Sequence, residues 1–283
     1  MSSSPEGSRP FLPLWQELST TEAGHLAASD PVVILPVAAV EQHGTHLPLS
    51  TDLEIGLGLL AEAFRQLPEE VSARVLPPLS VGASLEHREM PGTLTLSAGL
   101  LEAMLVELGG SVARAGVRRL VVVNSHGGNQ AVVERAALRL RASHELLVVK
   151  AYYPRFPPPP DPVFPEAEWR HGLHGGAVET SLMLHLRPDL VRMDRILPAT
   201  SLGEMLEAQG SRIGPQGAVP FAWLARDLTH TGVTGDPALA TAAAGAHVLA
   251  HYGGVLAEVI RDARAFPLER LASLDHAAPE PGS

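Results

Sequence analysis

The stretch PVVILPVAAVEQHGTHLPLSTD, from Pro31 to Asp52, decides which fold the chain can adopt. Its first ten residues are apolar and begin with β-branched side chains, which is typical of a strand buried on both faces. A glutamate, two histidines and an aspartate follow within twelve residues, although a turn needs only glycine, proline, asparagine or aspartate. The stretch therefore predicts a buried strand that ends at a cluster of metal-binding side chains.

Apolar runs and amphipathic segments alternate along the rest of the chain. The expected strands are 31–40, 73–82, 118–125 and 145–153. The expected helices are 52–67, 97–116, 130–143, 176–186 and 236–266, with a break in the last near Gly253. Because parallel strands are joined through helices, this order predicts an α/β fold with a mainly parallel central sheet and helices on both faces.

The expected organisation is one domain with flanking segments. Residues 31–270 form the domain, residues 1–30 an N-terminal extension, and residues 271–283 a flexible tail that is small, polar and proline-bearing. Two segments rich in proline or glycine, 154–172 and 200–235, are too long for simple connectors. We expect them to form active-site walls or subunit contacts.

Composition excludes several classes of function. Of the 283 residues, 45% are hydrophobic and 18% charged, which is typical of a globular chain. The net charge is -10 with scattered basic residues, which argues against nucleic acid or an anionic membrane as the main partner. The absence of cysteine excludes disulfides, thiolate metal sites and a cysteine nucleophile. No signal peptide or membrane-spanning apolar run is expected.

The candidate metal ligands follow the expected strands. Glu41 and His43 come after the first strand, His126 comes after the third, and Asp52 opens the next helix. The carboxyl ends of parallel strands meet at one edge of a sheet, where ligands bind. Nitrogen and oxygen ligands without sulfur suit zinc, manganese or iron. An aspartate with two oxygens can bridge two metals about 3.5–4 Å apart, which could hold a hydroxide between them.

Each candidate also has a simpler interpretation. Asp52 could cap its helix, and His126 could be a turn residue in SHGGN. His46 is expected in a loop or behind the ligands. Glu179 could be a solvated acid in the first turn of a helix, a metal ligand, or a carboxylate that orients a ligand. The combination favours a metal site, because two strand ends each supply a histidine and the first also supplies two acids.

Further polar residues follow the same pattern. His174 lies in a glycine-rich loop and suits a general acid/base. Glu86 and His87 follow the second strand and suit substrate contact, whereas the role of His230 stays open. The histidines expected to be structural or superficial are His144, His185, His247 and His251.

Four segments in order resemble the creatininase family of metal-dependent amidohydrolases. They are LPVAAVEQHGTHLPLSTD (35–52), VVVNSHGGN (121–129), HGGAVETSLML (174–184) and RDLTHTGVTGDPALATAAAG (226–245). The resemblance implies an α/β fold, a centre of two divalent metal ions (zinc, manganese or iron), and a cytoplasmic homo-oligomer, often a hexamer.

The resemblance also implies roles for single residues. Glu41 and His126 would bind one metal and His43 the other, with Asp52 bridging them. His174 matches the catalytic histidine of the family.

The chain departs from true creatinine hydrolases at several positions. Gly128 stands where those enzymes carry a glutamate ligand, and Glu179 is our candidate to complete the centre. Tyr153 and Arg170 stand where they carry tryptophans that sandwich the substrate. The expected substrate-binding residues are Glu86, His87, Tyr153 and Arg170.

Two motifs are more similar to other branches of the family. HGGN and GASLEHREMPGT (82–93) resemble deformylases of formamidopyrimidine nucleotides and the peptidase that trims the mycofactocin precursor. The sequence predicts an amidohydrolase that cleaves a non-peptide or cyclic amide C–N bond of a small molecule through a metal-activated hydroxide. The alternatives are a peptidase or deformylase of the same family, or a non-catalytic metal-binding homologue that acts as an assembly subunit.

Overall fold

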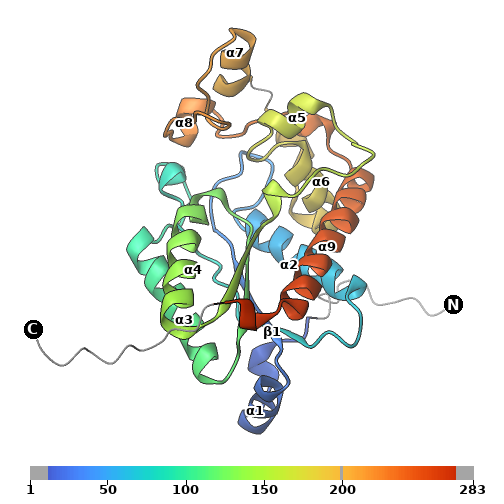
Figure 1. Ribbon diagram of the computed structural model, residues 1–283. Helices are drawn as coiled ribbons and strands as arrows, with labels where there is room; N and C mark the ends of the chain where they lie inside the picture. The colour runs from blue at the N-terminus through green and yellow to red at the C-terminus, as the bar shows by residue number, and fades with distance from the viewer. Residues whose placement is uncertain (1–11, 198–199, 272–283) are drawn as a thin grey trace, which may run out of the picture.

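The computed structural model describes residues 12–197 and 200–271 and contains one sheet of four parallel strands (Figure 1). The strands, in the sheet order β2–β1–β3–β4, are Ala73–Val75, Val32–Val37, Arg119–Asn124 and Leu147–Tyr152. Val37 lies opposite Asn124, and Asn124 lies opposite Tyr152, so three strands end at the same level. The predicted parallel α/β sheet is confirmed.

Helices cover both faces of the sheet, as predicted. Alternate residues of β1 face opposite cores: Val32 and Ile34 face one core, and Val33 and Leu35 face the other. The first core also includes side chains of α2 (Thr51–Gln66), α6 (Ala177–Leu186) and α9 (Ala242–Ala265). The second core includes side chains of α3 (Ala98–Arg114) and α4 (Gln130–His144).

Shorter helices lie outside these two layers. The first, α1 (Thr20–Ala28), falls in the expected N-terminal extension and begins with a capping box between Ser19 and Glu22. The expected loops contain α5 (Glu166–His171), α7 (Leu202–Ala208) and α8 (Ala225–Leu228), and the last two project from the body (Figure 1). The expected tail lies outside the described residues apart from residue 271. None of the helices in the described ranges combines the length and the apolar character needed to cross a membrane.

Several predicted boundaries were wrong for local reasons. β1 ends at Val37 because residue 38 bonds to Leu79 and residue 40 pairs with Leu94, which takes the chain out of the sheet. The last helix begins at Ala242 because the Asp236 side chain caps a separate turn.

The predicted break in α9 near Gly253 was also wrong. The helix continues through this residue, where a Cβ would lie 2.4 Å from Glu62 Cγ of α2. The glycine therefore serves close packing between two helices rather than a change of direction.

Gly245 gives a sharp test of this packing. A Cβ at this position would lie 1.8 Å from the backbone oxygen of Ser181 in α6. Gly245→Ala is therefore expected to lower the free energy of unfolding by about 1–3 kcal/mol, measured by urea denaturation. The matched control is Gly99→Ala in α3, where nothing lies within 4 Å of the new Cβ, and there the same change is expected to stabilise by about 0.4–1 kcal/mol. Equal effects at both glycines would contradict the packing argument.

Candidate metal centre

The carboxyl edge of the sheet gathers most of the residues that the sequence analysis singled out. The loop after β1 supplies Glu41 and His43, and the loop after β3 supplies His126. The first turn of α2 supplies Asp52, which forms no side-chain cap, so the interpretation of Asp52 as a helix cap was wrong. The first turn of α6 supplies Glu179.

Glu41, Asp52 and His126 form one set of donors. Nδ1 of His126 lies 3.2 Å from Oε1 of Glu41 and 3.7 Å from Oδ2 of Asp52. One donor atom from each residue lies within 4.8 Å of the others, and all three side chains are buried. This is the set expected for the first metal.

His43 collects a second set of donors around its Nε2 atom. Oδ1 of Asp52 lies 3.5 Å from this nitrogen, and Oε2 of Glu179 lies 3.7 Å from it. The other ring nitrogen, Nδ1, is 3.1 Å from the backbone oxygen of Glu41, which fixes the ring orientation. Asp52 therefore faces both histidines with different oxygens, the arrangement required of a bridging carboxylate.

The cluster leaves several buried polar atoms with ion-pair contacts but without hydrogen-bond partners. Both carboxylate oxygens of Glu41, Nε2 of His43 and Oδ2 of Asp52 are buried and accept or donate no hydrogen bond among the described residues. Burying such atoms without hydrogen bonds is costly, and native proteins rarely do so unless another group completes the site. These atoms are the donors that a divalent metal pair requires, so the residues fit such a centre.

The electrostatics of the cluster point the same way. Burial alone would lower the pKa of His43, but Asp52 and Glu179 outweigh it and raise the pKa to about 9. Burial alone would also lower the pKa of His126. The carboxylates of Glu41 and Asp52 outweigh this effect and raise the pKa of His126 to about 10. In both cases carboxylates that face an imidazole nitrogen attract positive charge, whether it is a proton or a metal cation.

Glu179 is held by two hydrogen bonds. Its Oε2 accepts from the backbone N–H of Gly175 at 2.6 Å, and its Oε1 accepts from the hydroxyl of Tyr153 at 3.3 Å. The carboxylate faces His43 in this position, so Glu179 is not a solvated surface acid. Tyr153 is almost wholly buried and lies behind Glu179, where its hydroxyl orients the carboxylate.

His174 stacks between two other imidazoles. Its ring centroid lies 4.1 Å from that of His43 and 4.4 Å from that of His87. Nε2 of His174 is 2.6 Å from the backbone oxygen of Gln42, which assigns the proton to this nitrogen and turns Nδ1 toward Glu41, 3.6 Å away. His174 therefore presents a free lone pair to the metal centre.

Glu86 and His87 also lie at the cluster. Nε2 of His87 is 3.5 Å from Oε1 of Glu41, and Oε1 of Glu86 is 3.5 Å from Nε2 of His126. The same His126 nitrogen lies 3.1 Å from the backbone oxygen of Ala83. Glu86 thus sits behind His126, on the side away from the expected metal, where it can orient the ring.

Gly128 provides the space for this contact. A Cβ here would lie 2.3 Å from the oxygen of Ala83, 2.5 Å from Oε1 of Glu86 and 2.6 Å from Nε2 of His126. In this chain Glu86 therefore takes up space that a side chain at position 128 would enter.

Arg170 was expected to bind substrate, but it does not lie near the cluster. It lies on the exposed side of α5 and forms ion pairs with Glu166 and Glu207. Trp169, next to it, packs against Phe164 with a centroid distance of 5.7 Å. The short helix α5 turns both side chains away from the metal-binding residues.

Sequence reasoning missed Gln42 as a member of the cluster. The side-chain nitrogen of Gln42 donates to Nδ1 of His87 at 2.9 Å and to the backbone oxygen of Gly232 at 3.1 Å, and it lies 3.1 Å from Nε2 of His174. Its only signal was its place between Glu41 and His43. His46 is buried and its Nε2 lies 2.9 Å from the hydroxyl of Thr180. The other five described histidines named above lie outside the cluster: His144, His185, His230, His247 and His251.

Comparisons with known proteins show which family the chain resembles over most of its length. Residues 16–260 match the family model described as Creatininase: Creatinine amidohydrolase. The chain is 34% identical over 237 residues to the mycofactocin precursor peptide peptidase of Mycolicibacterium smegmatis, covering 82% of this chain and 85% of that one. It is 35% identical over 205 residues to the creatinine amidohydrolase of Pseudomonas putida, covering 66% and 75%.

Solved structures show the same fold. A protein described as Creatininase Mn superposes with a TM-score of 0.72 at 27% identity, covering 89% of this chain and 98% of that chain. A crystal structure of creatinine amidohydrolase gives a TM-score of 0.72 at 28% identity, covering 90% and 98%.

Proposed function

This chain belongs to the creatininase family of hydrolases, and we propose that it cleaves an amide C–N bond at a dinuclear metal centre. The observation that carries the proposal is the group of buried donor atoms on Glu41, His43 and Asp52 that have no hydrogen-bond partner among the described residues. We assign one metal to Glu41, His126 and Asp52, and the second to His43, Asp52 and Glu179. Residues 31–270 would form this hydrolase domain, in a cytoplasmic homo-oligomer such as a hexamer.

The chemistry follows from the donors and from His174. A pair of divalent metal ions, zinc, manganese or iron, lowers the pKa of bound water to around 7 and polarises a carbonyl oxygen. The C–N bond breaks as a C–O bond forms, and the proton released by water must reach the leaving nitrogen. Nδ1 of His174 holds that proton between the two steps, because its Nε2–H is engaged by the backbone oxygen of Gln42.

Two substrate classes remain in view. The sequence favours a small-molecule amide, and the creatinine amidohydrolase of Pseudomonas putida acts, by its name, on such a compound. The curated relatives named mycofactocin precursor peptide peptidase favour a peptide. Both substrates are cleaved by the same C–N chemistry, so a panel of lactams, formamides and short peptides on metal-loaded protein tests the proposal. About two metals per chain would support an enzyme, and no bound metal after supplementation with manganese, zinc or iron would favour the non-catalytic alternative.

His174→Ala tests the assignment of the proton carrier. We expect the variant to keep two metals per chain, by elemental analysis, while hydrolysis falls by about 100- to 10,000-fold. His185→Ala on α6 changes an exposed histidine and should leave both quantities unchanged. Because His174 also lies among the possible donor sets, loss of metal together with activity would instead make it a ligand.

A further inference from the structure

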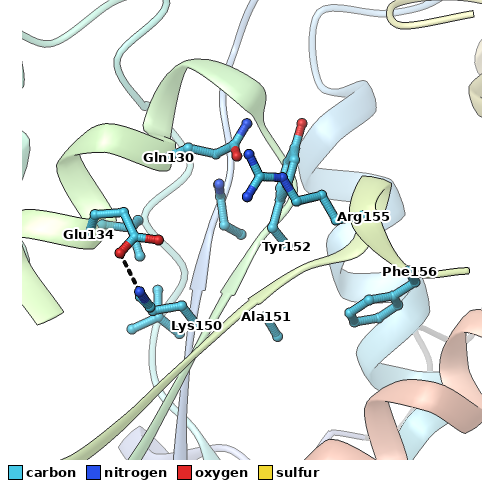
Figure 2. A pocket seen from close by; sticks show the side chains of 10 residues that line it. Gln130, Glu134, Lys150, Ala151, Tyr152, Arg155 and Phe156 are labelled. Atoms are coloured by element: carbon cyan, nitrogen blue, oxygen red, sulfur yellow. Dashed lines mark hydrogen bonds and ion pairs between the residues drawn. The ribbon is translucent and has the colours of Figure 1, made fainter. Parts of the chain in front are cut away.

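A pocket lies between β4 and α4, next to the proposed metal centre. Its volume is about 180 Å³, and its polar lining comes from Gln130, Glu134, Lys150, Tyr152 and Arg155 (Figure 2). The apolar part includes Val122, Val133, Ala151 and Phe156. None of these residues belongs to the proposed metal ligands.

The pocket adjoins the metal centre at Tyr152. A Cβ at Gly127, the residue after His126, would lie 3.3 Å from the Tyr152 hydroxyl. Burial raises the pKa of Tyr152, and the nearby carboxylates of Glu179 and Asp52 raise it further. The hydroxyl therefore keeps its proton and lies within electrostatic range of the proposed metal ligands. Asn124, which lines the pocket, also bonds through its side chain to the backbone of His126. A substrate that reaches both places would pass Tyr152.

The pocket carries two cationic side chains, Lys150 and the exposed Arg155. Lys150 is paired with Glu134, as the dashed line in Figure 2 shows. Arg155 has no ion pair among the residues that the structure describes, and its guanidinium lies over the Tyr152 ring, 5.9 Å from the centroid. Water can satisfy an exposed arginine, but Arg155 combines an accessible guanidinium with a partly apolar pocket, an arrangement that suits an organic anion.

The charge count selects the kind of anion. One guanidinium matches a single negative charge in a bidentate pair, whereas a phosphate dianion would need a second cation, and Lys150 is already paired with Glu134. The apolar walls suit the hydrocarbon part of the same molecule.

We propose that this pocket binds a carboxylate of the substrate, with Arg155 as its ionic partner. The inference rests on the proposed amide hydrolysis and narrows its substrate class to acidic amides: N-acyl amino acids or peptides cleaved near a free C-terminus. The Tyr152 hydroxyl and the Gln130 amide are the neutral hydrogen-bonding groups available beside the guanidinium.

The experiment uses four probes on the full, metal-loaded chain: N-benzoylglycine, its carboxamide, trialanine and trialanine amide. We expect the two carboxylates to have KM values about 10- to 100-fold lower than their amides, the range of a charge-assisted hydrogen bond. Arg155→Gln should remove this preference by raising KM for the carboxylates, with kcat within about twofold, and Arg155→Lys should retain part of it. Whichever carboxylate is preferred identifies the source as acylated amino acid or peptide.

Two matched variants sharpen the test. Glu134→Gln frees Lys150 and should lower KM for the carboxylates by about 2- to 5-fold, the opposite direction to Arg155→Gln. Arg114→Gln changes an exposed arginine at the end of α3, near the start of β3 and so at the opposite edge of the sheet, and should change nothing.

Failure of this inference differs from failure of the proposed function. If Arg155→Gln leaves the ratio of carboxylate to amide KM unchanged, the pocket does not bind the carboxylate. If the wild type hydrolyses no probe, the proposed function fails for these substrates, and calorimetric titration with N-benzoylglycine decides the pocket: Arg155-dependent binding supports it, and no binding overturns it. A variant that changes the oligomeric mass and leaves KM unaltered would make the pocket a contact between copies, which also overturns it.

Discussion

Asp52→Asn is expected to remove both metal ions from the protein and to lower amide hydrolysis by at least about 1,000-fold. The substitution keeps the size of the side chain and replaces one carboxylate oxygen by an amide that cannot bridge two cations. Asp52 faces His43 with Oδ1 at 3.5 Å and His126 with Oδ2 at 3.7 Å, so one change affects both halves of the proposed centre. Elemental analysis of the purified variant and steady-state kinetics on the probe panel measure the two effects.

Glu179→Gln is the natural comparison, because Glu179 faces only His43. It should lower the metal content from two to one per chain, while Asp52→Asn lowers it to none. Asp262→Asn, on the exposed side of α9, is the matched control and should leave two metals and full activity. If Asp52→Asn retained both metals, the bridging role would be wrong. If only Glu179→Gln retained both, Glu179 would orient His43 rather than bind.

The positions of the proposed metal ligands could be predicted from the sequence because each one follows a strong local signal. The strands that carry Glu41 and His126 are among the most apolar runs in the chain, and parallel strands place their carboxyl ends together whatever the details of packing. The same reasoning could not place Arg170. Its neighbours Glu166 and Glu207 determine where it points, and one of them belongs to the distant helix α7.

The contacts that hold the ligands in place could not be predicted for a related reason. Glu86 reaches His126 across a sequence separation that no periodicity encodes, and Gln42 lies against both His87 and His174 through a side chain that belongs to no sequence pattern. Gly128 was interpreted as the loss of a ligand. In the structure the glycine also leaves room for Ala83 and Glu86 to approach His126. They lie where the side chain of a larger residue at position 128 would begin.

Gly128→Ala is therefore expected to damage the centre although it adds only one methyl group. The new Cβ would lie 2.3 Å from the backbone oxygen of Ala83, which cannot rotate away, and 2.6 Å from Nε2 of His126. We expect the free energy of unfolding to fall by about 1–3 kcal/mol and metal affinity by about 10- to 100-fold, since His126 must turn. Denaturant titration of the apoprotein and competition with a chelator measure the two separately.

The adjacent glycine supplies the control. A Cβ at Gly127 would meet only the Tyr152 hydroxyl, at 3.3 Å, which is the movable end of a side chain, so Gly127→Ala should keep its metals. Gly128→Glu tests the stronger claim that this chain cannot simply regain the glutamate of true creatinine hydrolases. Its carboxylate would compete with Glu86 for the space beside His126, and we expect metal loss rather than a restored ligand. Removing the competitor in Glu86→Ala/Gly128→Glu should recover only part of the metal, because the clash with the Ala83 backbone remains. Full metal occupancy in Gly128→Glu alone would show that Glu86 does not hold this space, and the orienting role given to it would be wrong.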